Sequence, residues 1–301
     1  MAGWGVPQGR LSVKRRAVVA GALAVAVTAP AAAHLPPGSG RIELAEAAGA
    51  TREAMPVWFH RPAAWDEDGR VVVVMHGLNR DAGRYRDEWA ALAETGGFLV
   101  LVPEFSASKF PGTRCYNFGN LVDDEGRATA SESWSFHAFD RVVAAAMDAA
   151  HATRPGFILY GHSAGAQFVH RYLLLTGATR AERVIIANAG SYSLATDRPF
   201  PEGLGRTTAD PATLREVFAR PVVLQLGEAD TDPQHSSLPR QDWAVAQGSH
   251  RFARGWFFFD AMRRVAAAQG AVFNWRVATV PGVGHSNAGM AAHAASNLFG
   301  R

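Results

Sequence analysis

Cysteine is nearly absent from this chain of 301 residues, which has a single thiol at Cys115. No disulfide can form within the chain, so a packed core has to stabilise the fold. Charged residues are also scarce, at 19%, whereas hydrophobic residues make up 48%. This composition excludes a disordered or fibrous protein and is typical of a globular protein with a large core.

The chain also lacks a basic stretch of the kind that binds nucleic acid. Its formal net charge is +3, but four of its 30 basic residues lie within residues 1–33, where there is no acidic residue. The remainder has 26 basic and 27 acidic side chains, and its Lys and Arg residues are not interleaved with aromatic ones. We therefore expect no nucleic-acid partner.

Residues 1–33 have the three parts of an export signal. A basic region ends at Arg15-Arg16, an apolar run covers Ala17–Ala29, and the small residues Ala31–Ala33 follow. The run is shorter than the roughly 20 residues of a membrane span, and no later segment is long and apolar enough, so a permanent anchor is the weaker interpretation. We predict cleavage after Ala33, no stable membrane insertion afterwards, and a periplasmic or secreted product. The arginine pair resembles a twin-arginine signal, with Sec export as the alternative.

The rest of the chain alternates short apolar runs with longer amphipathic ones. Nearly continuous hydrophobicity is typical of strands that are buried on both faces, and the alternation predicts a parallel sheet covered by helices. Two shorter runs upstream, Ile42–Ala45 and Val57–His60, could add antiparallel edge strands. The predicted buried strands are Val71–Met75, Phe98–Val102, Phe157–Tyr160, Val184–Ala187, Val222–Leu226 and Trp275–Val280. The predicted helices are Arg84–Thr95, Ser135–His151, Ala166–Thr176, Thr213–Ala219, Arg254–Gln269 and Ala288–Phe299.

A G-x-S-x-G pattern lies between a predicted strand and a predicted helix. It reads Gly161, His162, Ser163, Ala164 and Gly165. In this setting the pattern is a nucleophile elbow, whose sharp turn leaves no room for side chains at its two glycines. The serine would project above the sheet, and the start of the next helix would favour negative charge beside it. We predict that Ser163 is a nucleophile, with Gly161, His162 and Gly165 as its supports.

A serine hydroxyl needs a base, and the base needs a carboxylate that orients it. Asp230 follows the strand Val222–Leu226, and His285 follows the strand Trp275–Val280 in a Gly-rich loop. Both positions are at the carboxyl ends of strands, and the order serine, aspartate, histidine is the order expected beside such an elbow. We predict a triad of Ser163, Asp230 and His285. Asp232 is the competing acid, but it precedes a proline, which suits it to a turn.

Acyl transfer also needs hydrogen-bond donors for the oxyanion. We predict that the backbone N–H groups of Ala164 and Leu78 form this hole. Leu78 follows the His76-Gly77 pair at the end of the strand Val71–Met75, and we expect His76 to brace this loop rather than to transfer protons.

The segments Val71–Leu78, Tyr160–Gly165, Gly227–Asp230 and Gly284–His285 resemble the α/β-hydrolase superfamily over essentially the whole chain after residue 34. The resemblance implies an α/β-hydrolase fold for residues 34–301, with a mostly parallel central sheet and helices on both faces. The elbow, the His-Gly loop and the export signal are also similar to those of polyhydroxyalkanoate depolymerases and feruloyl or acetyl xylan esterases. Members of that group often carry disulfides or a binding module, and this sequence has neither.

The resemblance implies an exported carboxylic-ester hydrolase whose substrate is a small-molecule or polymeric ester. No cofactor is implied, and no histidine pair has the spacing of a metal site. An amidase or peptidase with the same triad and a non-catalytic binding protein on the same fold are the alternatives. Two long connections, Glu104–Ser133 and Ser191–Pro211, follow strands and either shape the substrate pocket or form ordinary surface loops.

Overall fold

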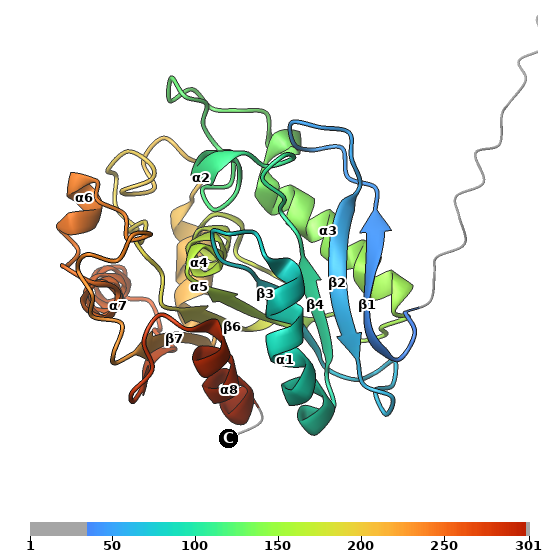
Figure 1. The fold of residues 1–301 in the computed structure, drawn as a ribbon. Coiled ribbons are helices and arrows are strands. Elements are labelled where there is room, and N and C mark those ends of the chain that lie inside the picture. The colour runs from blue at the N-terminus through green and yellow to red at the C-terminus, as the bar shows by residue number, and fades with distance from the viewer. Residues whose placement is uncertain (1–34, 299–301) are drawn as a thin grey trace, which may run out of the picture. The chain divides into compact units, whose positions relative to one another are not determined.

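The computed structural model describes residues 35–298, which form one central sheet with helices on both faces (Figure 1). The predicted export signal, with its cleavage after Ala33, lies outside the described residues. None of the helices within residues 35–298 is long and apolar enough to cross a membrane.

The sheet has eight strands in the order β1-β2-β4-β3-β5-β6-β7-β8. The pairs β1–β2 and β2–β4 are antiparallel, and every other pair is parallel. The carboxyl ends of the parallel strands therefore meet at one edge, which is where ligands bind in open α/β sheets. The strands are β1 Gly38–Leu44, β2 Met55–Arg61, β3 Val71–Met75, β4 Leu99–Pro103, β5 Phe157–His162, β6 Ala181–Ala187, β7 Val222–Gly227 and β8 Trp275–Val280.

Helices cover both faces of the sheet because its central strands are apolar on both sides. The helices are α1 Ala82–Gly96, α2 Gly112–Cys115, α3 Ser135–Ala149, α4 Ala164–Thr176, α5 Pro211–Ala219, α6 Asp242–Val245, α7 Arg251–Ala268 and α8 Asn287–Leu298, with a 3-10 turn η1 at Ser131–Ser133. Successive side chains of a strand point to opposite faces. In β3, Val72 and Val74 pack with α1 and α8, whereas Val71 and Val73 pack in the larger core that includes α3, α4, α5 and α7.

The fold class predicted from the sequence is confirmed, and the strand predictions for β3 and β8 match the structure residue for residue. Each predicted helix is present with ends shifted by up to three residues. Helix α4 begins two residues earlier than predicted, because Ser163 itself is its N-cap. The three short elements α2, η1 and α6 were not predicted, since each is too short to show a helical period.

Candidate active site

Ser163 lies at the tip of a tight turn between β5 and α4. Its φ of 59° and ψ of −117° are strained for a residue with a side chain. A Cβ atom on Gly161 would lie 2.4 Å from the carbonyl oxygen of Gly165, and one on Gly165 would lie 2.0 Å from that of Met75. The two glycines therefore let the start of α4 pack directly against the ends of β5 and β3.

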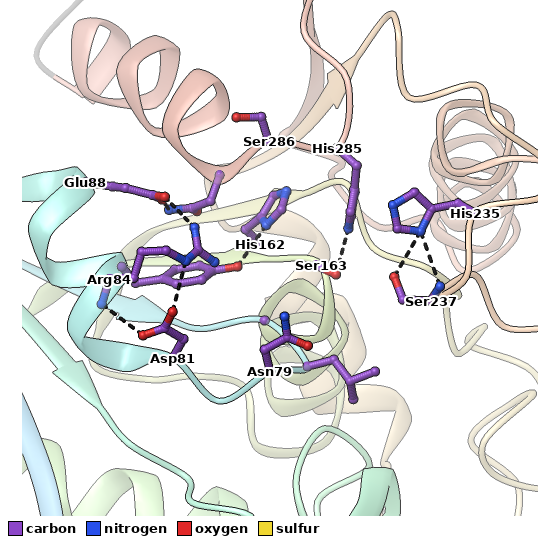
Figure 2. Close-up of a pocket in the computed structure, with 14 residues that line it drawn as sticks. Asn79, Asp81, Arg84, Glu88, His162, Ser163, His235, Ser237, His285 and Ser286 are labelled. Carbon is purple, nitrogen blue, oxygen red and sulfur yellow. Dashed lines mark hydrogen bonds and ion pairs between the residues drawn. The ribbon is translucent and has the colours of Figure 1, made fainter.

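The structure brings the side chains of Ser163, His285 and Asp230 together at the carboxyl edge of the sheet (Figure 2 shows the first two). His285 Nε2 is 3.0 Å from Ser163 Oγ, and His285 Nδ1 is 2.7 Å from Asp230 Oδ2. Asp230 is buried, whereas Asp232 is exposed and accepts a hydrogen bond from the backbone N–H of Gln234. Of the two candidate acids, Asp230 is thus the one that contacts the imidazole.

The other oxygen of Asp230 faces Arg251, a buried residue at the start of α7. Arg251 Nη1 is 3.5 Å from Asp230 Oδ1, and Arg251 Nη2 donates to Ser237 Oγ at 2.9 Å. Burial lowers the pKa of His285, the hydrogen bond to Asp230 raises it, and the charge of Arg251 lowers it again. The net direction is downward, so the imidazole is neutral at neutral pH and can accept a proton.

His162 lies beside this histidine, with the two ring centroids 4.8 Å apart. Its Nδ1 is hydrogen-bonded to the hydroxyl of Tyr85 at 3.0 Å, while its buried Nε2 has no hydrogen-bond partner within residues 35–298. Burial holds the pKa of His162 well below its usual range. A neutral ring at this position adds no repulsive charge beside His285.

His76 ties the loop after β3 to the end of β4. Its Nε2 accepts the backbone N–H of Phe105 at 3.0 Å, so its Nδ1 donates to Gly77 O, also at 3.0 Å. Burial lowers the pKa of His76 to about 4. Both ring nitrogens of His76 are hydrogen-bonded to the backbone, and neither is bonded to Ser163 or His285, which agrees with a bracing role.

The loop that His76 holds carries Leu78 to the mouth of the site. Leu78 is 43% exposed and lines the space around Ser163 together with Gly77. Ala164 is the first residue of α4, a position where a backbone N–H has no partner within the helix. Both N–H groups that the sequence predicts as oxyanion donors therefore belong to residues that line clefts beside the serine.

Two clefts have Ser163 in their lining. The first, which we call the Glu88 cleft, has a volume of about 340 Å³ (Figure 2). Besides Ser163 and His285, it is lined by residues of α1 and by the start of α8, among them Arg84, Glu88 and Asn287. The second, which we call the Arg240 cleft, has a volume of about 320 Å³ and is lined by Asn117, Phe118, Gln167 and residues 236–241.

The two long connections that the sequence singled out have different positions. Glu104–Ser133 contributes Thr113, Asn117 and Phe118 to the Arg240 cleft, whereas no residue of Ser191–Pro211 lines either cleft. The segment after Asp230 was missed, although residues of 235–241 line both clefts. Its position directly after β7, at the carboxyl edge of the sheet, was the signal that could have identified it.

Within residues 35–298, no group of three His, Cys, Asp or Glu side chains is arranged to hold a metal ion. The polar side chains that line the two clefts beside Ser163 carry imidazole, hydroxyl, amide and guanidinium groups and, in the Glu88 cleft, the carboxylates of Asp81 and Glu88.

No protein-family model and no curated protein sequence matches the chain. Two solved structures resemble it closely. Poly(aspartic acid) hydrolase-1 from Sphingomonas sp. KT-1 is 37% identical, with a TM-score of 0.83 over 88% of this chain and 100% of that one. LpqC, a poly(3-hydroxybutyrate) depolymerase from Bordetella parapertussis, is 33% identical, with a TM-score of 0.83 over 88% of this chain and 91% of that one. An S-formylglutathione hydrolase from Agrobacterium tumefaciens is 16% identical, with a TM-score of 0.56 over 88% of this chain and 95% of that one. This likeness concerns the fold alone.

Proposed function

Because this chain belongs to the α/β-hydrolase superfamily, in the group that includes poly(aspartic acid) hydrolase-1 and LpqC, we propose that it hydrolyses carboxylic esters with Ser163 as its nucleophile. The single observation that carries the proposal is the position of His285. One ring nitrogen lies 3.0 Å from the hydroxyl of Ser163, and the other lies 2.7 Å from the carboxylate of Asp230. An imidazole bound on both sides in this way is oriented to take the serine proton.

The reaction proceeds in two acyl-transfer steps. His285 Nε2 accepts the proton of Ser163 Oγ while this oxygen attacks the ester carbonyl, and the N–H groups of Leu78 and Ala164 stabilise the oxyanion. The C–O bond to the alcohol then breaks, and the alcohol leaves with the proton from His285. A water molecule loses a proton to the same nitrogen, attacks the acyl-enzyme, and releases the acid as Ser163 recovers its proton. Asp230 keeps the Nδ1–H tautomer and stabilises the imidazolium that forms in each step.

A fluorophosphonate probe tests the nucleophile. We expect the folded protein to be labelled covalently, and the label to map to Ser163 by peptide mass spectrometry. Ser163→Ala should abolish both labelling and ester turnover while leaving the circular dichroism spectrum unchanged. Folded protein that resists the probe would favour the alternative of a non-catalytic binding protein.

Amide hydrolysis is the second candidate, and one comparison favours it. The 37% identical relative is named as a hydrolase of poly(aspartic acid), whose units are joined by amide bonds. The same triad can serve both bonds, so we propose to compare p-nitrophenyl esters of increasing chain length with the matching p-nitroanilides. Films of poly(3-hydroxybutyrate) and soluble poly(aspartic acid) would show whether a polymer is accepted. Ester cleavage without measurable cleavage of the matching anilides would support the primary proposal, and release of p-nitroaniline that Ser163→Ala abolishes would replace it by amide hydrolysis.

We also propose that the chain is exported, a conclusion that depends on the sequence of residues 1–33 alone. Mass spectrometry of the periplasmic or secreted protein should find a mature form that starts at His34. Replacing both Arg15 and Arg16 by Lys separates the two routes, because it should block twin-arginine export and spare Sec export. A secreted product that retains Ala17–Ala29 would contradict the signal-peptide interpretation.

A further inference from the structure

The two clefts beside Ser163 differ in charge. In the Glu88 cleft, Arg84 forms ion pairs with Asp81, at 3.2 Å, and with Glu88, so its charge is compensated within the lining itself. Among the described residues that line the Arg240 cleft, the single charged one is Arg240, which is exposed. Arg240 contacts the neutral side chain of Gln234 at 3.5 Å and forms no ion pair with the described carboxylates.

A second cation lies buried beneath the floor of the Arg240 cleft. The guanidinium of Arg171, on α4, lies 4.3 Å from the ring centroid of Phe118, and its Nη1 donates to the backbone oxygen of Asn117. Its Nε donates to Ser193 Oγ, and its buried Nη2 has no hydrogen-bond partner within residues 35–298. All these acceptors are neutral. Burial lowers the pKa of Arg171 to about 9, which still leaves it charged at neutral pH.

A third cation lies beneath the rim formed by residues 236–241. Arg254, also fully buried, donates to the backbone oxygens of Gly190, Pro239 and Gly248, and again none of its partners carries a negative charge. Burial, together with the nearby charges of Arg251 and Arg240, lowers the pKa of Arg254 to about 10. The charged neighbours of this guanidinium are therefore other arginines.

The carboxylates close to these arginines along the chain do not neutralise the cleft. Asp230 is engaged by His285 and Arg251, and the exposed Asp232 and Asp242 do not contribute to the lining. Buried cations without a counter-ion are costly, and their field is weakly screened inside a protein. An anion that enters the Arg240 cleft would reduce this cost, whereas the same anion in the Glu88 cleft would meet two carboxylates.

We infer that the Arg240 cleft is a carboxylate-binding subsite, so that the substrates are esters or amides with a second, ionised carboxyl group near the bond that is cleaved. This inference rests on the proposed function and specifies its substrate class. Arg240 would contact the carboxylate directly, as a side chain free to move and able to donate two parallel hydrogen bonds. Arg171 and Arg254 would act through their field. Arg171 and Arg254 are buried and also hold the cleft walls through their hydrogen bonds, so replacing either would disturb the core. Arg240 is exposed, and its charge can therefore be removed without changing the core.

The test compares substrates that differ only in charge. Monomethyl esters of succinate, glutarate and adipate carry a carboxylate on the acyl side, and each is matched with the methyl ester whose far end is a primary amide. Acetate esters of 3-hydroxybutyrate and of 3-hydroxybutyramide place the same pair on the alcohol side. We expect kcat/KM to be about tenfold higher for the ionised member of at least one pair, a difference equivalent to about 1.4 kcal/mol. Raising NaCl from 0.1 M to 1 M, where the Debye length falls from about 10 Å to about 3 Å, should weaken this preference.

Arg240→Gln should reduce the preference, measured as the ratio of kcat/KM within each pair, to about twofold or less. Arg264→Gln is the matched control, because Arg264 is exposed on α7, nearly three turns beyond Arg254, and lines neither cleft. It removes the same charge and should keep the preference. Equal turnover of charged and neutral members in every pair would overturn the subsite and leave the ester hydrolase standing, as would a preference that survives Arg240→Gln. Failure of the folded protein to react with a fluorophosphonate would remove the proposed function and this inference together.

Discussion

Replacing Gly165 by alanine should damage both the stability of the fold and its hydrolytic activity. The added Cβ would lie 2.0 Å from the carbonyl oxygen of Met75 and 2.8 Å from that of His76. Such atoms essentially never approach within 3.0 Å, so α4 and the end of β3 would have to separate by at least 1 Å. Both clashing oxygens belong to the backbone, and neither can rotate away as a side chain would.

The losses of stability and of rate both follow from that displacement. Overpacking a core costs about 1–3 kcal/mol, and a clash with backbone falls at the upper end, near 3 kcal/mol. A protein of this size would lose roughly 6–12 °C of its melting temperature. The same shift moves Ser163 and Ala164 relative to Leu78, and a misplacement of about 1 Å costs on the order of a hundredfold in rate.

Differential scanning fluorimetry and kcat/KM on p-nitrophenyl acetate measure the two effects. Gly83→Ala is the matched control, since Gly83 lies within α1 and the atoms nearest to its new Cβ belong to the Trp58 side chain, at 3.3 Å, which a shift of that ring by a few tenths of an ångström would relieve. Alanine stabilises a helix by about 1 kcal/mol relative to glycine, so the free energy of unfolding of this variant should be unchanged or slightly higher. The reasoning would be wrong if Gly165→Ala melted within about 2 °C of the unaltered protein and retained at least a third of its kcat/KM.

Asp230→Asn should lower kcat on the order of 10⁴-fold, because the imidazole loses the partner that fixes its tautomer. Asp232→Asn should change kcat less than twofold. Equal losses of kcat in steady-state assays of the two variants would contradict the assignment of Asp230. Since the pKa of His285 is lowered from 6.5 and its neutral form is the base, the acid limb of kcat/KM should have its midpoint below pH 6.5, and a midpoint above 7 would count against it. His76 has a pKa of 6.5 when unfolded and about 4 when folded, so its contribution to stability is complete above pH 6.5 and is lost as the pH falls toward 4. This site alone should remove about 3 kcal/mol from the free energy of unfolding, and urea titrations that show no loss over that range would contradict its burial as a neutral ring.

The parts of the fold that the sequence predicts are those in which every residue experiences the same environment. Each residue of β3 is buried, so five consecutive apolar letters predict the strand and its bounds. The elbow is predicted equally well, because its two glycines are required by contacts within a few residues of the turn and with the neighbouring strand.

The cleft walls could not be predicted in the same way. Residues 236–241 are mostly polar and follow no period, and their position depends on Arg251 and Arg254, which hold Ser237 and Pro239 from a helix further along the chain. The charge of the Arg240 cleft likewise depends on Arg171, whose place in the sequence is an ordinary helical position. Whether an arginine there faces solvent or the floor of a cleft is decided by tertiary packing.

The position of β8 at the margin of the sheet has a consequence for inactivation by heat. This strand has a neighbour on one side only, so its fraying breaks a single ladder, whereas β5 is held by strands on both sides. His285 follows β8 and Ser163 follows β5. Partial opening at the margin costs less than opening at the centre. On warming, the imidazole would therefore separate from the hydroxyl while the middle of the sheet is still intact. Turnover would be lost at a lower temperature than the ellipticity that reports secondary structure.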